Sequence, residues 1–536
     1  MVAATRMTGG QAVVAALEAN GVEVVFGIPG VHTLAIYRAL AQSRIRHILA
    51  RHEQGAGFMA DGYARATGRP GVAIIITGPG LTNVSTPVGE AYADSSPVLI
   101  ISAENPRADA AKMRGHLHDL NDQLGLMRHL TKWNTQVDEP TAIPDAINEA
   151  FTQMRSGRPR PTHVQIPLDV LAAEAEISVT PAPEGVRERP DSTAIAEAAA
   201  VLRGAHRVVL YAGGGATQSE AGGAVAELAA LLGAPVVTNP PGKAAIAADS
   251  PYYLGTAFYR AAPPIHEVLT GSEVGVVIGS KLGAQSTGNW TLPLPKRLIH
   301  IDIDPAELGR NYPAEVKIAG DARLACEMLA DAVRAGGGPA ERWTEAEIAA
   351  KRAAVREALA TSYQPYIDAL REALPRDGII THDMTTLSYM CHSRFPASAS
   401  RSYLSPHGYG TLGFSVPAAI GAKIGQPHRE VVAVVGDGGY QFTMEELAVA
   451  IQYGVTLPVV IFNDSTYTAV KRGMDDWQGY IGVDLVNPDY VTLAAAYGIP
   501  GVRVTDAAAL APAIREAQTR PGPTLIDVPI ASPHDF

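Results

Sequence analysis

Residues 431–454 read VVAVVGDGGYQFTMEELAVAIQYG. An apolar run, a glycine-rich turn and a helix-forming segment follow one another, which is typical of a buried parallel strand leading into a helix. Glycines let the backbone approach a ligand closely, and N–H groups at a helix N-terminus favour phosphate. Asp437, at the end of the expected strand, is well placed to hold a hard cation such as Mg²⁺. We also expect Thr443 and Glu446, three residues apart at the helix start, to form a capping box.

A second chemically suggestive turn follows this segment. Residues 459–462 predict another buried strand, which runs into Asn463-Asp464-Ser465-Thr466-Tyr467. Asp464 comes 27 residues after Asp437, enough for one helix and a return strand. Their oxygen ligands would then lie at the carboxyl edge of neighbouring strands, where open α/β sheets bind ligands.

Val- and Ile-rich segments alternate with segments of helical length along the whole chain, which predicts an α/β fold of parallel sheets with helices on both faces. Two Pro-, Gly- and charge-rich segments, 180–191 and 334–345, are expected to be linkers. We therefore predict an N-terminal domain over 1–180, a central domain over 190–335 and a C-terminal domain over 345–536.

The two outer domains share three motifs in the same order. GVAIIITGPG (71–80) resembles VVAVVGDGG (431–439), SPVLIISAEN (96–105) resembles LPVVIFND (457–464), and RPRPTHVQIP (158–167) resembles RPGPTLIDVP (520–529). The offsets are 360, 361 and 362 residues, so we expect one shared fold, with chance similarity among buried strands as the alternative. At the turn after the first of these repeated strands, only the third domain has an acidic residue, Asp437. Only the third domain is therefore expected to bind a cation.

Composition narrows the class of protein. The 536 residues are 47% hydrophobic and carry a formal net charge of −11, which argues against nucleic-acid binding. No apolar run is long enough to span a bilayer, and the N-terminus lacks the apolar core of a secretory signal. Cys326 and Cys391 form no metal-spacing motif, and a disulfide framework is excluded. We expect a soluble, cytoplasmic, multidomain enzyme.

Taken together, these motifs resemble the thiamine-diphosphate-dependent superfamily of acetohydroxyacid synthase, pyruvate oxidase and 2-oxoacid decarboxylases over essentially the whole chain. The resemblance implies that Mg²⁺ is held by Asp437, Asp464 and the carbonyl oxygen of Thr466. Most relatives have Asn-Asn where this chain has Asn463-Asp464, so the second ligand is expected to be a carboxylate, with Asn463 as the alternative.

RHEQGAGFMADGYARATGRPG (51–71) resembles the catalytic glutamate segment of the family. The resemblance implies that Glu53 hydrogen-bonds the pyrimidine ring of the cofactor, whose imine then removes the C2 proton to give an ylid that attacks a 2-oxoacid. The alternative is a helix-entry glutamate without a catalytic role. In the family this domain and the metal domain facing it come from different subunits, which implies a homodimer or homotetramer with the active site at the interface.

The resemblance places further cofactor contacts in turns after the expected strands. They are Pro29, Thr77 and Asn83 in the N-terminal domain, and Thr385, Thr386, Gly410, Leu412, Gly436, Asp437, Gly438, Gly439, Asn463, Thr466 and Tyr467 in the C-terminal domain. It implies that Leu412 separates the two cofactor rings and that the Gly410 carbonyl accepts from the 4′-amino group. Each segment alone could be ordinary turn or core sequence. FAD is doubtful, because SKLGAQSTGNW (280–290) stands where relatives have a basic FAD-contacting stretch.

GIPGVHTLAIYRAL, RHEQGAGFMADGYAR, RGHLHDLNDQ and GYGTLGF together most resemble the 5-guanidino-2-oxopentanoate decarboxylase branch. Asp119 and Asp122 would then face a cationic substrate tail, because guanidinium favours carboxylates; solvated loop residues are the alternative. Candidate substrate residues are Val31, His32, His118, Asp119, Gln123 and Val470. His407 is a candidate proton donor.

We therefore expect thiamine-diphosphate- and Mg²⁺-dependent decarboxylation of a 2-oxoacid through a C2-ylid and an enamine. The enzymatic alternative is an acetolactate-synthase-like carboligase, although Gly473 stands where that enzyme has a tryptophan. A non-catalytic cofactor-binding paralogue is a minor alternative, because Glu53, Asp437 and Asp464 are all present.

Overall fold

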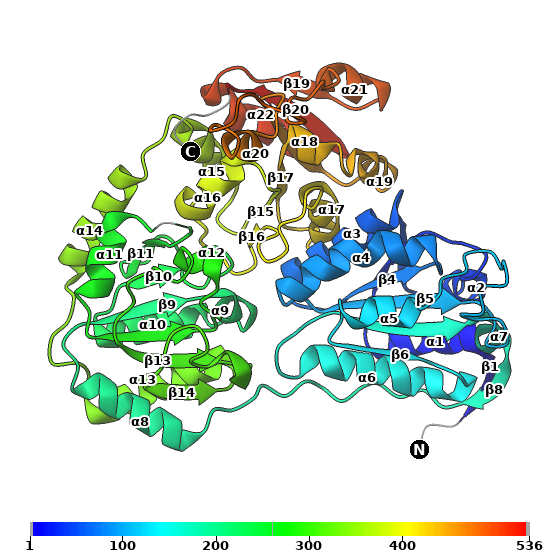
Figure 1. Cartoon of the computed structure of the whole chain (residues 1–536), viewed down its shortest axis with the longest axis horizontal. Coiled ribbons are helices and arrows are strands. Elements are labelled where there is room, and N and C mark those ends of the chain that lie inside the picture. The colour runs from blue at the N-terminus through cyan, green and yellow to red at the C-terminus, as the bar shows by residue number, and fades with distance from the viewer. Residues whose placement is uncertain (1–3, 260, 532–536) are drawn as a thin grey trace.

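Three six-stranded parallel sheets organise the chain in the computed structural model, which describes residues 4–259 and 261–531. Helices cover both faces of each sheet, as predicted. In Figure 1 the N-terminal and central domains lie side by side and the C-terminal domain lies across both. An antiparallel pair, β1 (Thr5–Thr8) and β8 (Glu174–Ile177), joins the ends of the N-terminal domain.

The N-terminal sheet is doubly wound, with its strands added outward in both directions from β2 and β4. In spatial order its strands are β3 (Arg46–Leu49), β2 (Val24–Gly27), β4 (Gly71–Ile75), β5 (Val98–Glu104), β7 (Thr162–Pro167) and β6 (Trp133–Gln136). Its helices are α1 (Gly9–Ala19), α2 (Leu34–Leu40), α3 (Glu53–Thr67), α4 (Pro79–Ala93), α5 (Gln123–Arg128), η1 (Pro140–Ala142), α6 (Ile143–Arg155) and α7 (Leu168–Ala172).

The C-terminal sheet repeats this order strand for strand. Its strands are β16 (Tyr403–Leu404), β15 (Ile379–His382), β17 (Val431–Gly436), β18 (Leu457–Asn463), β20 (Pro523–Pro529) and β19 (Gly501–Arg503). Its helices are α15 (Gln364–Ala373), α16 (Thr386–Arg394), α17 (Ser415–Gly425), α18 (Asp437–Tyr440), η3 (Met444–Glu446), α19 (Leu447–Gln452), α20 (Thr468–Arg472), α21 (Tyr490–Ala496), η4 (Ala507–Ala509) and α22 (Leu510–Gln518). The three repeated motifs occupy β4 and β17, β5 and β18, and β7 and β20, so the shared fold is confirmed.

The central domain has a sheet of its own between these two. Its strands are β11 (Tyr253–Thr256), β10 (Val236–Thr238), β9 (Val208–Ala212), β12 (Val274–Ile278), β13 (Arg297–Asp302) and β14 (Val316–Ala319). Its helices are α8 (Ser192–Arg203), α9 (Gly214–Gln218), α10 (Gly222–Leu232), α11 (Pro263–Thr270), α12 (Ala284–Thr287), η2 (Pro305–Glu307), α13 (Ala322–Gly336) and α14 (Glu345–Ala358). Through Ile348 and Val355, α14 packs in the core of this domain, although it begins the third predicted segment.

One hydrophobic core joins the two outer domains. It contains the inner faces of both sheets together with α3, α4, α17 and α19. At the crossing of α3 and α17, a Cβ on Gly62 would lie 2.1 Å from the Ala418 carbonyl oxygen, and one on Gly421 would lie 1.9 Å from that of Met59. Only glycine permits so close a backbone contact, so the crossing is symmetric and tight.

The expected capping box is wrong. Thr443 makes no side-chain cap, and its hydroxyl donates instead to the Gly413 carbonyl at 2.9 Å. The Glu446 carboxylate turns away from its own helix and accepts backbone N–H groups of the N-terminal domain. Tertiary contacts have replaced the local motif.

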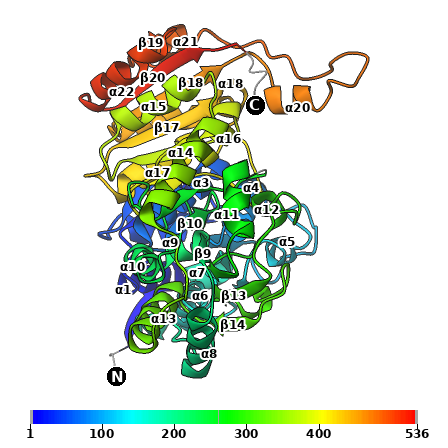
Figure 2. The same cartoon turned by 90° about the vertical axis from the view of Figure 1, so that its left-hand side faces the viewer.

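After β18, α20 and the chain that follows it extend away from the body of the C-terminal domain (Figure 2). Exposed apolar side chains, among them Val470, Trp477 and Ile481, lie on this segment. No helix among the described residues is long and apolar enough to cross a membrane.

Candidate active site

The residues predicted to bind metal meet at the carboxyl edge of the C-terminal sheet. Gly436 of β17 pairs with Phe462 of β18, so Asp437 and Asn463 leave neighbouring strands together. Asp437 is only 3% exposed, and burial raises the pKa of its carboxyl, with the nearby charge of Asp464 raising the pKa further. Two carboxylates therefore share this edge, where a divalent cation would relieve their repulsion.

Asn487 connects the group, and no sequence motif had singled it out. Its Nδ2 donates to Asp437 Oδ2 at 2.6 Å and to Asn463 Oδ1 at 3.0 Å. The Asp464 carboxylate accepts a hydrogen bond from the Thr468 hydroxyl. Among residues 4–259 and 261–531 no three His, Cys, Asp or Glu side chains cluster for metal binding. A cation here would complete its shell with amide, carbonyl or ligand oxygens, which suits Mg²⁺.

The glycines of the GDGG turn let neighbouring side chains pack directly against the backbone. A Cβ on Gly438 would lie 2.4 Å from Cε1 of Tyr467, and one on Gly436 would lie 2.7 Å from Oγ1 of Thr385. Thr466 is buried, and its hydroxyl donates to the Val483 carbonyl. The Thr466 hydroxyl is thus already engaged, and the groups here that fit a diphosphate are the backbone N–H groups of the turn and the Thr385 hydroxyl beside Gly436.

Asp383 fixes the neighbouring loop that carries Gly410 and Leu412. Its carboxylate follows β15 and accepts from the backbone N–H groups of Met384 at 2.8 Å, Gly413 at 3.3 Å and Ser415 at 3.2 Å. Burial raises its pKa to about 6. An acidic residue directly after a buried strand was the available sequence signal for this contact.

Glu53 begins α3 in the N-terminal domain. Its Oε2 accepts from Nδ2 of Asn83 at 2.9 Å, which joins two predicted cofactor residues from α3 and α4. The His52 side chain caps the helix by accepting from the Gln54 N–H. Glu53 is half-buried, so one carboxylate oxygen is fixed by Asn83 while the group still borders open space.

Thr77 follows β4 at the position equivalent to Asp437. Its hydroxyl donates to Gln123 Oε1 at 2.6 Å, and the same oxygen accepts from the Gly78 N–H at 2.9 Å. Gln123 is buried and holds this turn, and its role toward a substrate stays a prediction. Pro29, in the turn after β2, is exposed.

The candidate substrate residues of the N-terminal domain form a second group. His32 contacts Asn105 Oδ1 at 3.2 Å and stacks on His118 with ring centroids 5.2 Å apart. The Asp119 carboxylate accepts from Nδ2 of Asn105 at 3.1 Å and from two backbone N–H groups of its own turn. Asp122 caps α5 through the Gly125 N–H. Both aspartates therefore have local partners, and their role toward a substrate stays a prediction.

Two further candidates, Val31 and Val470, are 57% and 55% exposed and lie in the N-terminal and C-terminal domains, respectively.

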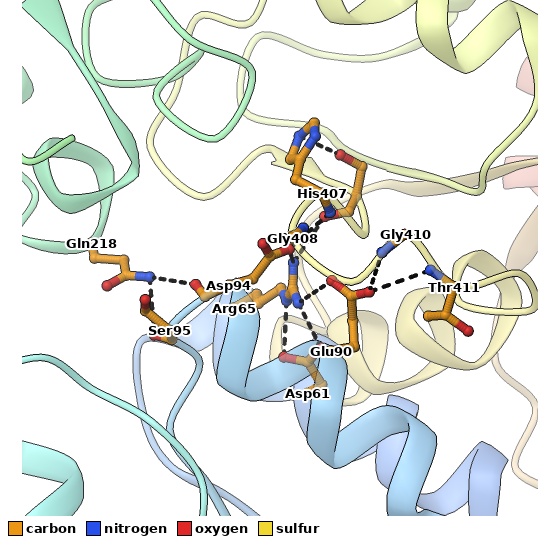
Figure 3. Close-up of polar contacts among 11 residues, drawn as sticks. Asp61, Arg65, Glu90, Asp94, Ser95, Gln218, His407, Gly408, Gly410 and Thr411 are labelled. Carbon is orange, nitrogen blue, oxygen red and sulfur yellow. Dashed lines mark hydrogen bonds and ion pairs between the residues drawn. The ribbon is translucent and has the colours of Figure 1, made fainter. Parts of the chain in front are cut away.

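A buried ion-pair cluster holds the loop 405–411 against the N-terminal domain (Figure 3). Arg65 pairs with Asp61 at 2.8 Å and with Asp94 at 2.9 Å, and donates to the Ser405 carbonyl at 2.9 Å. Asp94 accepts from the backbone N–H groups of His407 and Gly408. Burial lowers the pKa of His407 to about 4, so its imidazole is neutral near pH 7.

Cavities of about 500 and 270 Å³ lie where the three domains meet, and neither is lined by Glu53 or Asp437. The smaller cavity is lined in part by residues 280–281 and 283–286. These residues belong to the segment that stands where relatives have an FAD-contacting stretch.

Three models of one family match the chain. They are described as thiamine pyrophosphate enzyme, N-terminal TPP binding domain (residues 7–126), central domain (195–329) and C-terminal TPP binding domain (383–528). The chain is 41% identical to "Probable 2-ketoarginine decarboxylase AruI" of Pseudomonas aeruginosa, over 97% of this chain and 94% of that protein. It is 34% identical to "Probable acetolactate synthase large subunit" of Methanocaldococcus jannaschii, over 98% and 92%, and 35% identical to "Acetolactate synthase" of Mycobacterium bovis, over 94% and 84%.

Proposed function

The chain belongs to the thiamine pyrophosphate enzyme family, and on that premise we propose that it decarboxylates a 2-oxoacid with a guanidino side chain. The predicted superfamily and its thiamine-diphosphate-binding domains are confirmed by the three matching models. The observation that carries the substrate class is the 41% identity, over nearly the full length, to a probable 2-ketoarginine decarboxylase.

The C-terminal edge would hold the diphosphate end of the cofactor. Asp437 and Asp464 would bind Mg²⁺ together with the Thr466 carbonyl, and Asn487 would keep the Asp437 carboxylate oriented. Backbone N–H groups of Gly438 and Gly439 would face the phosphate oxygens, with Thr385 and Thr386 as hydroxyl donors. Bound there, the cofactor supplies an electron sink for the carbanion left by loss of carbon dioxide.

Glu53 would hold a proton at the pyrimidine ring nitrogen. Asn83 fixes one of its carboxylate oxygens, which leaves the other free to meet the cofactor. The Gly410 carbonyl and the Leu412 side chain would orient the same ring from the C-terminal domain. Asp383 supports this arrangement, because it ties the backbone on both sides of Phe414 to the end of β15.

The substrate tail would meet the N-terminal group around Asp119. Three hydrogen bonds hold that carboxylate in one orientation, which suits it to recognise a guanidinium fork. His32 and His118 stack beside it and would form an apolar wall for the methylene chain.

A panel of 2-oxoacids tests the substrate class. We expect 5-guanidino-2-oxopentanoate to give the highest kcat/KM, with carbon dioxide and the matching aldehyde as products, and pyruvate to be turned over poorly. Asp119→Asn should raise KM for the guanidino substrate and leave KM for a neutral 2-oxoacid unchanged. A preference for pyruvate would overturn the proposal.

Carboligation is the second candidate, and it is favoured by the acetolactate synthase relatives. Incubation with pyruvate alone separates the two reactions: dominant acetolactate supports the carboligase, and free aldehyde supports the decarboxylase.

We further propose that a second copy of the chain completes the active site. We also propose that the protein works in the cytoplasm. Glu53 and Asp437 lie in different domains, and neither lines the two cavities where the three domains meet. Exposed apolar side chains lie in segments that follow strands of both outer domains: Val31, Leu34, Met113, Leu117, Tyr409, Phe442, Val470, Trp477, Tyr480, Ile481 and Val486. Such patches are typical of subunit interfaces.

Analytical ultracentrifugation tests this assembly. We expect a dimer or tetramer, and Ile481→Asp should shift it toward monomer with loss of turnover. Val186→Asp, at an 83% exposed position of the linker, is the matched control and should change neither. A fully active monomer would overturn the proposal.

A further inference from the structure

Each outer domain has a buried glutamate that accepts hydrogen bonds from the backbone of the other outer domain. Glu446 of the C-terminal domain accepts from the backbone N–H of Arg51 at 3.1 Å and of His52 at 2.8 Å, in the N-terminal domain. Glu90 of the N-terminal domain accepts from the N–H of Gly410 at 3.1 Å and of Thr411 at 3.4 Å, in the C-terminal domain (Figure 3). Each glutamate thus holds a loop of the other domain.

The two contacts are copies of one another. Glu90 and Glu446 are 356 residues apart, and the dipeptides 51–52 and 410–411 are 359 apart, close to the repeat spacing of the outer domains. The residue after each dipeptide is a predicted cofactor residue, Glu53 in one case and Leu412 in the other. The duplicated fold therefore places the same contact beside both halves of the cofactor site.

Both glutamates are buried, so each depends on the hydrogen bonds it accepts. Both glutamates are 0% exposed, and a buried carboxylate is costly unless hydrogen bonds satisfy it. Arg65 lies 3.7 Å from Glu90 Oε1, while the backbone N–H groups are the closest donors to Glu446. Burial raises the pKa of Glu446 to about 7 and that of Glu90 well above its ordinary value.

The sequence of α3 also accommodates Glu446. A Cβ on Gly55 would lie 2.0 Å from Glu446 Oε1 and 2.3 Å from its Cδ, so any side chain there would push the carboxylate off the dipeptide. Gly55 follows Glu53 by two residues in the first turn of α3. The carboxylate consequently packs directly on the turn that aims Glu53.

We propose that Glu446 and Glu90 are reciprocal positioning residues: Glu446 sets the place of Glu53 through the backbone of Arg51 and His52, and Glu90 sets that of Gly410 and Leu412. The inference rests on the proposed function for the roles of Glu53, Gly410 and Leu412. Neither glutamate touches the reacting atoms. Each acts through the backbone of the opposite domain.

Amide hydrogen exchange of the cofactor-free protein tests the contacts themselves. Glu446→Ala should speed exchange in peptides covering Arg51 and His52, and Glu90→Ala in peptides covering Gly410 and Thr411, each without effect on the other loop. Glu445→Ala, in the same 3₁₀ turn as Glu446, is the matched control and should change neither. Unchanged protection in both variants would overturn the inference.

Deuterium exchange at C2 of bound thiamine diphosphate, without substrate, tests the consequence. Because small misplacements of catalytic groups are costly, Glu446→Ala should slow this exchange by about 10-fold to 100-fold while the Kd for the cofactor changes by less than about 3-fold. Glu446→Gln keeps an acceptor oxygen and should restore most of the rate. Glu90→Ala should mainly weaken cofactor binding.

Gly55→Ala displaces the Glu446 carboxylate from the other side and should reproduce the slow C2 exchange, even if Glu446→Ala fails to fold. A wild-type protein that does not accelerate C2 exchange would overturn the proposed function, and this inference with it. Wild-type acceleration that Glu446→Ala and Gly55→Ala both retain would overturn the inference alone.

Discussion

The first and third domains have the same strand order but different residues at equivalent turns. After β4 the chain has Thr77, whose hydroxyl bonds a buried glutamine; after β17 it has Asp437, which faces a second carboxylate. At the next equivalent pair, Glu53 in the first domain corresponds to Leu412 in the third. On the proposed function, one architecture would carry proton chemistry on one copy and cation and phosphate binding on the other, and a few turn residues would make the difference.

Removing the acid of the first domain should break the chemistry and spare binding. Glu53→Gln keeps the shape of the side chain and removes its proton-accepting carboxylate, so turnover should fall by about 10²-fold to 10⁴-fold. The Kd for thiamine diphosphate should stay within about 3-fold, because Glu53 is not among the residues proposed to hold the diphosphate and Mg²⁺. Steady-state kinetics and a fluorescence titration measure the two effects. Glu23→Gln, on the surface of the same domain, is the control. Unchanged turnover in Glu53→Gln would show that Glu53 has no part in the mechanism.

The opposite change should break binding first. Asp437→Asn removes a charge that balances the cation, so the Kd for Mg²⁺ and thiamine diphosphate should rise by about 100-fold, and excess cofactor should restore part of the turnover. Isothermal titration calorimetry gives the affinity. The equivalent substitution in the first domain, Thr77→Val, should leave the Mg²⁺ dependence as it is. Equal Mg²⁺ affinity in Asp437→Asn and wild type would contradict the division between the two copies.

Asn487 sharpens the comparison, because it supports the third domain's Asp437. Asn487→Ala frees the Asp437 and Asn463 side chains that its amide connects, and loss of such a supporting partner lowers metal affinity by about 10-fold to 100-fold. We expect the lower end of that range, measured by Mg²⁺ titration of cofactor binding. Gln441→Ala removes hydrogen bonds to the Asn487 side chain and the Asp437 carbonyl but none to the Asp437 carboxylate, so it should have a smaller effect. A tighter Mg²⁺ complex in Asn487→Ala would show that the amide competes with the cation.

The central domain forms hydrogen bonds with both outer copies. Gln218 donates to carbonyl groups of the first, whereas the buried Lys243 amine donates to the His392 carbonyl of the third. Burial lowers the pKa of Lys243 to about 7. Because this folded-state pKa lies below the unfolded value, wild-type stability should fall as the pH falls from about 10 toward 7.

Lys243→Met removes that dependence. At pH 7 its Tm should exceed that of the wild type by about 2–4 °C, with a smaller gain at pH 10, measured by thermal melts across this range. Lys317→Met, at an exposed strand position, is the control and should show no pH-dependent gain. Parallel wild-type and Lys243→Met curves would argue that the amine is already compensated.

The sequence could predict the fold because strand and turn patterns are local and were present twice. The duplicated motifs even anticipated the matching sheet orders of β4 with β17 and β5 with β18. Asp437 and Asp464 were also predictable as neighbours, since consecutive parallel strands end at one edge.

Contacts over long sequence distances could not be predicted in this way. Glu446 has the spacing of a local cap, yet its partners are 394 and 395 residues away, and nothing in the local pattern distinguishes the two outcomes. Asn487 lies in a segment without apolar periodicity, so only the folded chain brings it to Asp437. Asp119 and Asp122 suggested a substrate site through the family resemblance and their charge, and their local backbone partners became visible only in the structure.

The core shared by α3 and α17 bears on how the chain is made. The surface of α3 that Gly62 opens is covered by a helix encoded some 360 residues later, after the whole central domain. At ribosomal speeds of about 5–20 residues per second, that interval lasts roughly 20–70 s. During it, the nascent first domain has Phe58 without Phe414, the ring against which it packs in the folded protein. This face of α3 is therefore most in need of a chaperone between the synthesis of α3 and the synthesis of α17.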